Sequence, residues 1–213
     1  MSEHTNPGST DRTRVKRIPE RAVTDRQAMY EVLDAGLVAH VAVVSDGQPF
    51  VIPVAYARDG DRVLFHGSSA SRLMKSLAGG LQTCFTVTLL DGLVCARSAF
   101  ESSMNYRSVM VLGTAQLLGG EDELHALEVI SEHLIPGRWS EIRHPNEQEV
   151  KATKVLALDL LECSVKIRTG PPEDLQEDLD DPVYSQVWAG VVHLKETLRA
   201  PADAPEYIKS WTR

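Results

Sequence analysis

The feature that most constrains the fold is a rapid succession of short β-type runs joined by tight turns. Residues 37–44 are rich in β-branched side chains and end at Ser45-Asp46-Gly47-Gln48. Residues 50–57 end at Asp59-Gly60-Asp61, before a third run over 63–66. Turns this short join antiparallel neighbours, because a parallel connection needs a dozen or more residues. This part of the chain therefore predicts a three-stranded antiparallel meander.

The rest of the chain continues as strands with few helices. We expect a hairpin over 83–96 around Asp91-Gly92, a bulge or sharp bend at Gly113 within 106–118, and a last long strand over 155–168. Caps and periodicity predict three helices: Thr24 to Gly36, Arg72 to Gly79-Gly80, and 121–134 before Pro136-Gly137. Six or seven strands with tight turns predict a mainly β fold, an antiparallel barrel with peripheral helices.

Length and composition indicate a single domain. The 213 residues are 43% hydrophobic and 24% charged, which is ordinary for a globular protein. The arm 1–20 is polar and has no periodicity, so we expect it to be mobile or to lie on a partner subunit. The domain is expected over 21–193, with an acidic surface excursion at 169–182 and a polar tail over 194–213.

Charge and motif content exclude several classes of function. A net charge of −8 argues against a general nucleic-acid binder, which needs a basic face. No apolar run is as long as a membrane span and the polar start lacks the core of a signal peptide, so we expect a cytoplasmic protein without membrane contact. Cys84, Cys95 and Cys163 form no CxxC pair and predict buried reduced thiols. The seven histidines show no metal-ligand spacing, which predicts no zinc or iron site.

The first candidate site is a strand-to-helix junction. The run 63–66 leads into Gly67-Ser68-Ser69-Ala70-Ser71 and then a short helix that begins Arg72-Leu73-Met74-Lys75. This junction offers backbone N–H groups, hydroxyls and two cations to one point, which is the chemistry of a phosphate seat. The alternative is a plain helix N-cap, the commoner use of such a turn.

Two further segments carry groups that can bind a polyfunctional ligand. Asn105-Tyr106-Arg107-Ser108 offers amide, phenol, guanidinium and hydroxyl groups at a strand entrance, with an Asx-type turn into an edge strand as the alternative. The two prolines of Gln48-Pro49-Phe50-Val51-Ile52-Pro53-Val54 leave backbone groups outside a ladder. Such groups can bind the amide edge of a flat heteroaromatic ring, although protection of a sheet edge is the more frequent reason.

In chain order, these segments and three others resemble the pyridoxamine 5′-phosphate oxidase-like flavoproteins, and within them the branch that contains the nitroimidazole-resistance proteins. The resemblance covers about residues 20–193. It rests on six motifs: Gln48 to Val54, Phe65-His66-Gly67 with Ser71-Arg72, Asp91-Gly92-Leu93-Val94, Asn105 to Ser108, Lys166 with Gly170-Pro171-Pro172, and Trp188-Ala189-Gly190-Val191. It implies a split β-barrel of Greek-key type, a homodimer, and FMN bound in a groove between the subunits.

The resemblance also implies which residues hold the cofactor. They are Ser71, Arg72 and Lys75 at the phosphate, His66, Gly67 and Ser68 along the ribityl chain, the backbone of Ile52, Pro53 and Val54 at the ring edge, Asn105, Tyr106 and Ser108 beside the groove, and Trp188 over the ring or the substrate space. His66 and Tyr106 are the candidate catalytic residues. For His66, cofactor contact and strand capping are the alternatives to proton transfer.

The sequence departs from this family in two places. Glu101-Ser102 stand where members of the branch often carry two histidines, which puts a shared substrate in doubt. No Arg-x-His pair follows Trp188-Ala189-Gly190, which disfavours a vitamin B6 oxidase.

The resemblance implies an FMN-dependent oxidoreductase that moves hydride between a nicotinamide donor and a small aromatic or nitro-bearing molecule. The alternatives are a flavin- or ligand-binding protein without turnover and a deazaflavin-dependent reductase on the same fold. A haem-binding relative is a further alternative, which no histidine spacing supports.

Overall fold

The computed structural model describes residues 5–195, 202–204 and 208, and it is built around one curled antiparallel sheet. Hydrogen-bonded neighbours follow the order β6-β7-β3-β2-β1-β4-β5-β8, and β9 pairs with β4. The strands are β1 (Val38–Ser45), β2 (Gln48–Asp59), β3 (Arg62–Ser68), β4 (Gln82–Cys95), β5 (Ser103–Thr114), β6 (Gln116–Leu117), β7 (Thr153–Asp159), β8 (Glu162–Arg168) and β9 (Gly190–His193). The predicted mainly β, split-barrel fold is confirmed.

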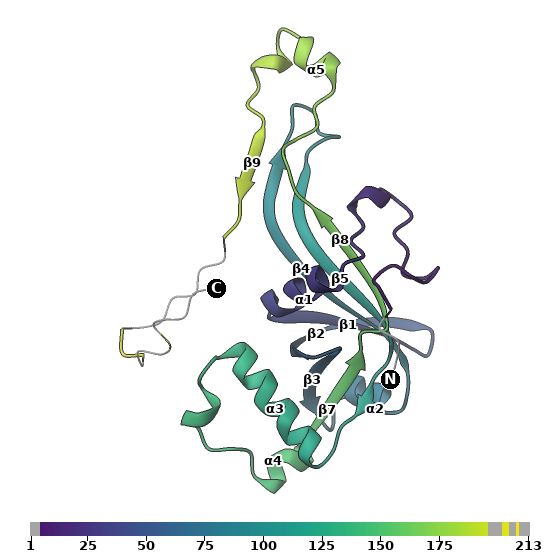
Figure 1. The fold of residues 1–213 in the computed structure, drawn as a ribbon, viewed down its shortest axis with the longest axis vertical. Helices are drawn as coiled ribbons and strands as arrows, with labels where there is room; N and C mark the ends of the chain where they lie inside the picture. The colour runs from purple at the N-terminus through teal and green to yellow at the C-terminus, as the bar shows by residue number, and fades with distance from the viewer. Residues whose placement is uncertain (1–4, 196–201, 205–207, 209–213) are drawn as a thin grey trace.

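Short helices surround this sheet (Figure 1). They are α1 (Arg26–Ala35), α2 (Arg72–Ala78), α3 (Glu121–Leu134), α4 (Glu147–Ala152) and α5 (Gln176–Asp180). The predicted helix over 121–134 is confirmed, as is the end of the first helix at Gly36. Its N-cap is Asp25 rather than Thr24, because the Asp25 carboxylate accepts from the backbone N–H groups of Gln27 and Ala28.

The predicted meander is also confirmed. β1 pairs with β2 along its whole length, from Val38 opposite Ala55 to Ser45 opposite Gln48. β2 pairs with β3 only over its last four residues, Tyr56–Asp59. The earlier part of β2 therefore has β1 on one side and no strand on the other, which leaves backbone groups outside a ladder, as its prolines indicated.

The prediction of a hairpin at Asp91-Gly92 is wrong. β4 runs on through both residues, and the register with β5 shifts between Leu90 and Gly92, so that Asp91 is the extra residue of a bulge. Arg107 on β5 holds it there, since its Nε and Nη2 donate to the two Asp91 carboxylate oxygens at 2.9 and 2.7 Å.

The bulge expected at Gly113 is absent, because Gly113 pairs in register with Thr83. A Cβ at Gly113 would lie 3.0 Å from Leu158 Cδ1, so glycine here permits a close approach of β5 to β7. The β-type run ends at Thr114, and only the two-residue β6 follows it.

The last long strand expected over 155–168 is two strands. β7 and β8 are joined at Leu160-Leu161 and lie far apart in the sheet order, β7 beside β3 and β8 beside β5. Leu160 is fully buried and its N–H donates to Asp61 O at 2.8 Å. With the short β6 and β9, this separation makes nine strands in the described chain rather than six or seven.

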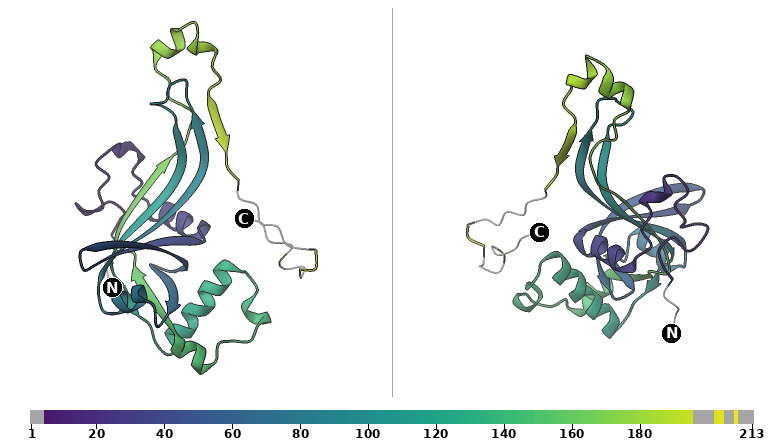
Figure 2. Two further views of the ribbon diagram at one scale, coloured as in Figure 1. Left: turned by 180° about the vertical axis from the view of Figure 1, so that it is seen from behind. Right: turned by 45° about the horizontal axis from the view of Figure 1, so that its top comes forward.

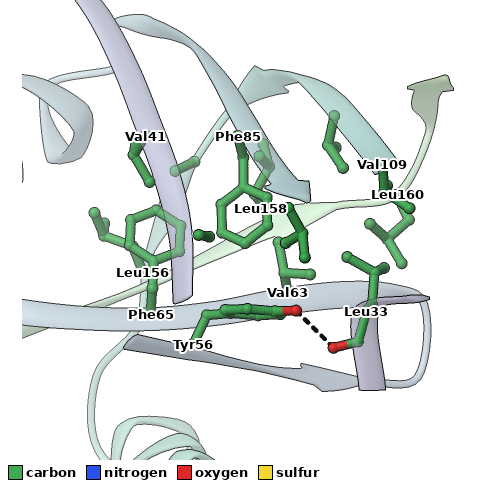
Figure 3. Close-up of a cluster of buried hydrophobic side chains, with 14 of the residues drawn as sticks. Leu33, Val41, Tyr56, Val63, Phe65, Phe85, Val109, Leu156, Leu158 and Leu160 are labelled. Carbon is green, nitrogen blue, oxygen red and sulfur yellow. Dashed lines mark hydrogen bonds between the residues drawn. The ribbon is translucent and has the colours of Figure 1, made fainter. Parts of the chain in front are cut away.

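The core fills the inside of the curled sheet (Figure 3). Tyr56, Phe65 and Phe85 are fully buried, and the Tyr56 and Phe85 rings meet edge to face with centroids 5.2 Å apart. The Tyr56 hydroxyl donates to the carbonyl oxygen of Leu33 across 2.6 Å, which ties α1 to β2. A second, smaller cluster lies under α3, where Ala126 and Ile130 meet side chains of β2, β3 and β7.

The N-terminal arm contacts its own chain. Gly8 N–H donates to Cys163 O at 2.7 Å, the Thr10 hydroxyl bonds to Glu162 at 2.8 Å, and Thr13 is 2% exposed. The described part of the arm therefore packs on β8, although we expected it to be mobile or to lie on a partner subunit. Most of the tail beyond Lys195 lies outside the described residues.

The ends of β4 and β5 project from the barrel, as both views of Figure 2 show. We call residues 91–106 and 168–193 the stalk. They comprise these strand ends, α5, and β9, which returns along β4 from Cys95 opposite Gly190 to Gly92 opposite His193. No helix in the described chain is long and apolar enough to cross a membrane.

Candidate functional site

The first group of predicted site residues surrounds a cavity at the barrel end of the molecule. Ser71 and α2 form one wall, and β1 and β2 form the other. The cavity has a volume of about 250 Å³ and is lined by Val43, Ser45, Phe50, Ile52, Ser71, Arg72, Leu73 and Ser76. Three of the predicted cofactor residues, Ile52, Ser71 and Arg72, therefore share one space.

The Ser71 hydroxyl and the Arg72 guanidinium at this cavity make no hydrogen bond or ion pair within the described chain. Ser71 is the N-cap of α2, yet its side chain makes no capping hydrogen bond. Arg72 lies over the Phe50 ring, with Cζ 4.3 Å from the centroid. Among the described residues no carboxylate forms an ion pair with Arg72 or with Lys75, so the positive charge here is not neutralised internally. Lys75 is exposed and does not line the cavity.

His66, Gly67 and Ser68 end β3 beside this cavity without lining it. Burial lowers the pKa of His66, which keeps its imidazole neutral at pH 7. Its Nδ1 is buried and has no hydrogen-bond partner among the described residues. A Cβ at Gly67 would lie 2.9 Å from Met74 Cγ, so glycine lets β3 pass close to α2. The Ser68 hydroxyl accepts from Ala70 N–H at 3.2 Å and shapes the turn.

The predicted ring-edge segment lies on the free side of β2. Ile52 is 42% exposed and lines the cavity, while Val54 packs against the core. Pro53 pairs with His40 on β1 and has no strand on its other side. This part of β2 thus has backbone groups outside a ladder, as the prolines predicted.

The second group of predicted residues lies at and below the stalk. Asn105 is 6% exposed: its Nδ2 donates to Gly170 O at 3.0 Å and its Oδ1 accepts from Arg168 Nη1 at 2.7 Å. Tyr106 stands opposite Arg168, and the Ser108 hydroxyl donates to Lys166 O at 3.3 Å.

Trp188 lies just before β9 and is 64% exposed. A Cβ at Gly190 would lie 2.8 Å from Trp188 Cζ2, so the edge of the indole rests on this glycine. The rest of the indole is open to solvent. Such an exposed apolar ring is available to cover a ligand or another chain.

The two groups do not meet within one chain. α2 lies at the barrel end, whereas β9 lies beside the far ends of β4 and β5 (Figure 1). Asn105 is opposite Gly92, which is in turn opposite His193 of β9, so Asn105 belongs to the stalk. None of Asn105, Tyr106, Ser108 and Trp188 lines the cavity at Ser71.

Sequence reasoning missed several residues of these two regions. Val43, Ser45, Leu73 and Ser76 line the cavity, and the alternation of β1 and the periodicity of α2 could have placed them. No local signal marks Arg168 or the pair Arg97 and Asp174. The Asp174 carboxylate accepts from Arg97 N at 2.7 Å and from Arg97 Nη1 at 2.5 Å. These two hydrogen bonds lower the pKa of Asp174, and the bond from the Arg97 backbone has the larger effect. They also connect the acidic excursion at 169–182 to the end of β4.

One face of the sheet is apolar and exposed over much of its length. Cross-strand partners point to the same side of a sheet, so register identifies the residues of this face. We call it the outer face; its exposed apolar residues, each 44–58% exposed, are Val38, Val44, Val51, Leu90, Leu93, Met104 and Val192. Val192, Leu93 and Met104 are direct neighbours across three strands. The outer face therefore runs from the barrel into the stalk.

The described residues contain no cluster of three or more histidine, cysteine or acidic side chains that could hold a metal ion. His125 lies 3.5 Å from Asp59, His133 bonds to Gly36 O at 2.7 Å, and the His144 ring stacks on Trp139. The side chains of the other described histidines, His40, His66 and His193, have no hydrogen bond or ion pair within the described chain.

Comparisons with known proteins agree with this fold. The sequence model of the pyridoxamine 5′-phosphate oxidase family matches residues 25–167. The FAD and heme binding protein from Mycobacterium smegmatis is 37% identical over 87% of this chain and 90% of that chain, with a TM-score of 0.81. Flavocytochrome Anf3 from Azotobacter vinelandii is 41% identical over 98% of this chain and 95% of that chain, with a TM-score of 0.84.

A third solved structure shares the fold alone. A candidate 5-nitroimidazole antibiotic resistance protein from Bacteroides thetaiotaomicron is 19% identical over 68% of this chain and 86% of that chain, with a TM-score of 0.57. No curated protein matches the chain.

Proposed function

The chain belongs to the pyridoxamine 5′-phosphate oxidase family, and on that premise we propose that it is a flavin-dependent oxidoreductase, active as a homodimer, that carries haem beside its flavin. The observation that carries the proposal is the cavity at Ser71 and Arg72, which combines an unneutralised guanidinium with apolar walls. Support for haem comes from two relatives: the one at 37% identity is named as an FAD and heme binding protein, and the one at 41% as a flavocytochrome.

The cavity fits the phosphate end and ring edge of a flavin. Arg72 and the Ser71 hydroxyl would hold a phosphate, and Phe50 and Ile52 would exclude water from the ring beside the free backbone of β2. FMN and FAD share these parts, so this end of the site accommodates either. FMN is the cofactor implied by the sequence motifs, and FAD is the one named in the relative from M. smegmatis.

A homodimer accounts for two features that a single chain leaves open. The outer face exposes apolar side chains on β1, β2, β4, β5 and β9, and soluble monomers rarely expose large apolar patches. The predicted cofactor residues at Ser71 and at Asn105 lie in separate parts of one chain. We propose that the outer faces of two copies meet and that the stalk of one copy, with Trp188, closes the groove of the other.

Three histidines of the described chain could supply a haem ligand. Haem iron takes a neutral imidazole nitrogen, and burial keeps His66 in that form with Nδ1 unpartnered. The side chains of His40 and His193 are equally free of hydrogen bonds within the described chain. His40 lies in the row Pro53, His40, Thr86 across three strands of the outer face, so a dimer would bury it.

When bound, a flavin supplies hydride chemistry with a nicotinamide donor and haem supplies one-electron chemistry. The chain itself positions these groups and keeps water away, and no pair of carboxylates or Ser-His-Asp set is needed. Haem is the first candidate acceptor of electrons from the flavin. A small aromatic or nitro-bearing molecule is the second, because the cavity walls at Phe50 and Ile52 suit a flat ring.

The test is the spectrum of the purified full-length protein. We expect flavin bands and a Soret band, release of FMN or FAD identified by mass after heat denaturation, and bleaching of the flavin by NADH or NADPH. Flavin that no nicotinamide reduces would favour a binding protein without turnover. A deazaflavin in the released fraction would favour the deazaflavin reductase. Protein that binds none of these cofactors would overturn the proposal.

A further inference from the structure

Arg168, the last residue of β8, is a buried cation. It is 6% exposed, and it is the one buried Arg, Lys, Asp or Glu among the residues that the structure describes. It stands opposite Tyr106 on β5 and beside Asn105, both of which the sequence predicted at the cofactor groove. Arg168 therefore lies where the stalk would border the proposed cofactor groove.

The hydrogen bonds of Arg168 are incomplete. Nη1 donates to Asn105 Oδ1 at 2.7 Å, whereas Nε is buried without a partner. No carboxylate of the described chain forms an ion pair with it. Neighbouring arginines differ in this respect, because Arg107 is bidentate to Asp91 and Arg97 is bonded to Asp174.

This arrangement is costly unless something else supplies a negative charge. A guanidinium cannot lose its proton at any ordinary pH, so burial does not neutralise it. A buried charge without a counter-charge is strongly destabilising. Asn105 is a positioning residue here: its amide donates to Gly170 O, which turns its oxygen toward Arg168 without adding charge.

We propose that Arg168 binds an anionic oxygen group of a cofactor at the stalk end of the groove. The proposal rests on the proposed function. A guanidinium edge matches the paired oxygens of a phosphate or a carboxylate. Two cofactor groups have this chemistry: the second phosphate of FAD, which FMN lacks, and a propionate of haem. The first phosphate of the flavin belongs to Ser71 and Arg72.

The experiment compares the affinities of wild-type protein and Arg168→Met for FAD, FMN and hemin, each titrated into stripped full-length protein. We expect a loss of tenfold or more for one ligand class only. A loss for FAD with FMN unchanged identifies the second phosphate, and a loss for hemin with both flavins unchanged identifies a propionate. Arg58→Met is the matched control, because its guanidinium already has a carboxylate partner in Asp34 and lies outside the stalk.

A second variant keeps the test decisive if Arg168→Met folds poorly. Asn105→Asp gives the guanidinium an internal carboxylate and loses the hydrogen bond to Gly170 O, so it is expected to weaken the same ligand. Equal losses for all three ligands, or no loss in either variant, would overturn the role of Arg168. Wild-type protein that binds neither flavin nor hemin would instead overturn the proposed function.

Discussion

The guanidinium of Arg72 lies over the ring of Phe50, with Cζ 4.3 Å from the ring centroid. Both residues line the same cavity, one from α2 and the other from β2. Stacking on an aromatic face fixes the plane of a guanidinium and leaves its N–H edge free. The contact thus holds a cation in place at the point where the proposed flavin phosphate would enter.

Replacing Arg72 by Ala is expected to weaken flavin binding by about 1.5–3 kcal/mol, the usual value of a hydrogen bond to a charged group. Quenching of flavin fluorescence in a titration measures this change. Arg58→Ala is the control, since Arg58 pairs with Asp34 at 2.7 Å and does not line the cavity. Unchanged affinity in Arg72→Ala would remove Arg72 from the site.

Replacing Leu93 by Arg is expected to convert the proposed dimer into a monomer. Leu93 lies on the outer face between Val192 and Met104, so a buried interface there would have to accept an unpaired charge. Light scattering during size-exclusion chromatography gives the mass. Leu124→Arg, on the exposed side of α3, is the matched control and should remain dimeric. A monomeric wild-type protein would contradict the interface.

Local signals were sufficient for much of the fold. The turns at Asp46-Gly47 and Gly60 and the Pro136-Gly137 stop after α3 are local signals, and they placed the meander and the long helix. The continuation of β4 through Asp91 could not be predicted in this way. Asp-Gly is ordinarily a turn, and here it is a bulge because Arg107, sixteen residues away, holds the carboxylate.

The sequence likewise predicted only part of the candidate site. The Ser71-Arg72 motif is local, and the structure places it at a cavity together with Ile52. The burial of Arg168 depends on β5 and on the chain after Gly170 folding over it. No periodicity in sequence reports such long-range packing, so a charged residue at a strand end looked like ordinary surface.

The three cysteines should differ in reactivity. Burial raises the pKa of the Cys163 thiol to about 12, so the nucleophilic thiolate is negligible at pH 8. Cys84 and Cys95 are only partly buried. Iodoacetamide at pH 8 is expected to label Cys84 and Cys95, which lie on the outer face, in the folded Leu93→Arg monomer, and Cys163 only after unfolding. Mass spectrometry of the digest assigns each label, and labelling of Cys163 in the native state would contradict its burial.

His66 should make the protein less stable in mild acid. Burial lowers its pKa below the ordinary value of 6.5, so the unfolded chain binds the proton more readily than the folded one. The stability that depends on neutral His66 is fully present above pH 6.5 and is lost as the pH falls below this value. Urea unfolding at pH 7.5 and 5.5 should therefore show a larger decrease for wild-type protein than for His66→Gln. An equal decrease would mean that His66 titrates normally.

Gly36 and Tyr56 should be energetically coupled. A Cβ at Gly36 would lie 2.6 Å from Tyr56 Oη and 2.7 Å from Val87 Cγ1, so Gly36→Ala overpacks the core and should cost about 1–3 kcal/mol of unfolding free energy. Tyr56→Phe removes the hydroxyl that donates to Leu33 O and should cost about 1–3 kcal/mol, because a buried carbonyl loses its donor.

The double variant tests this contact. With the hydroxyl gone, the added methyl group clashes only with Val87, so Gly36→Ala is expected to cost less in the Tyr56→Phe background than alone, by roughly 0.5–3 kcal/mol. Urea unfolding of the four proteins measures the cycle. Gly119→Ala is the control, since a Cβ there meets nothing within 4 Å. Strict additivity would show that the hydroxyl does not occupy the space beside Gly36, and the tie between α1 and β2 would then need another cause.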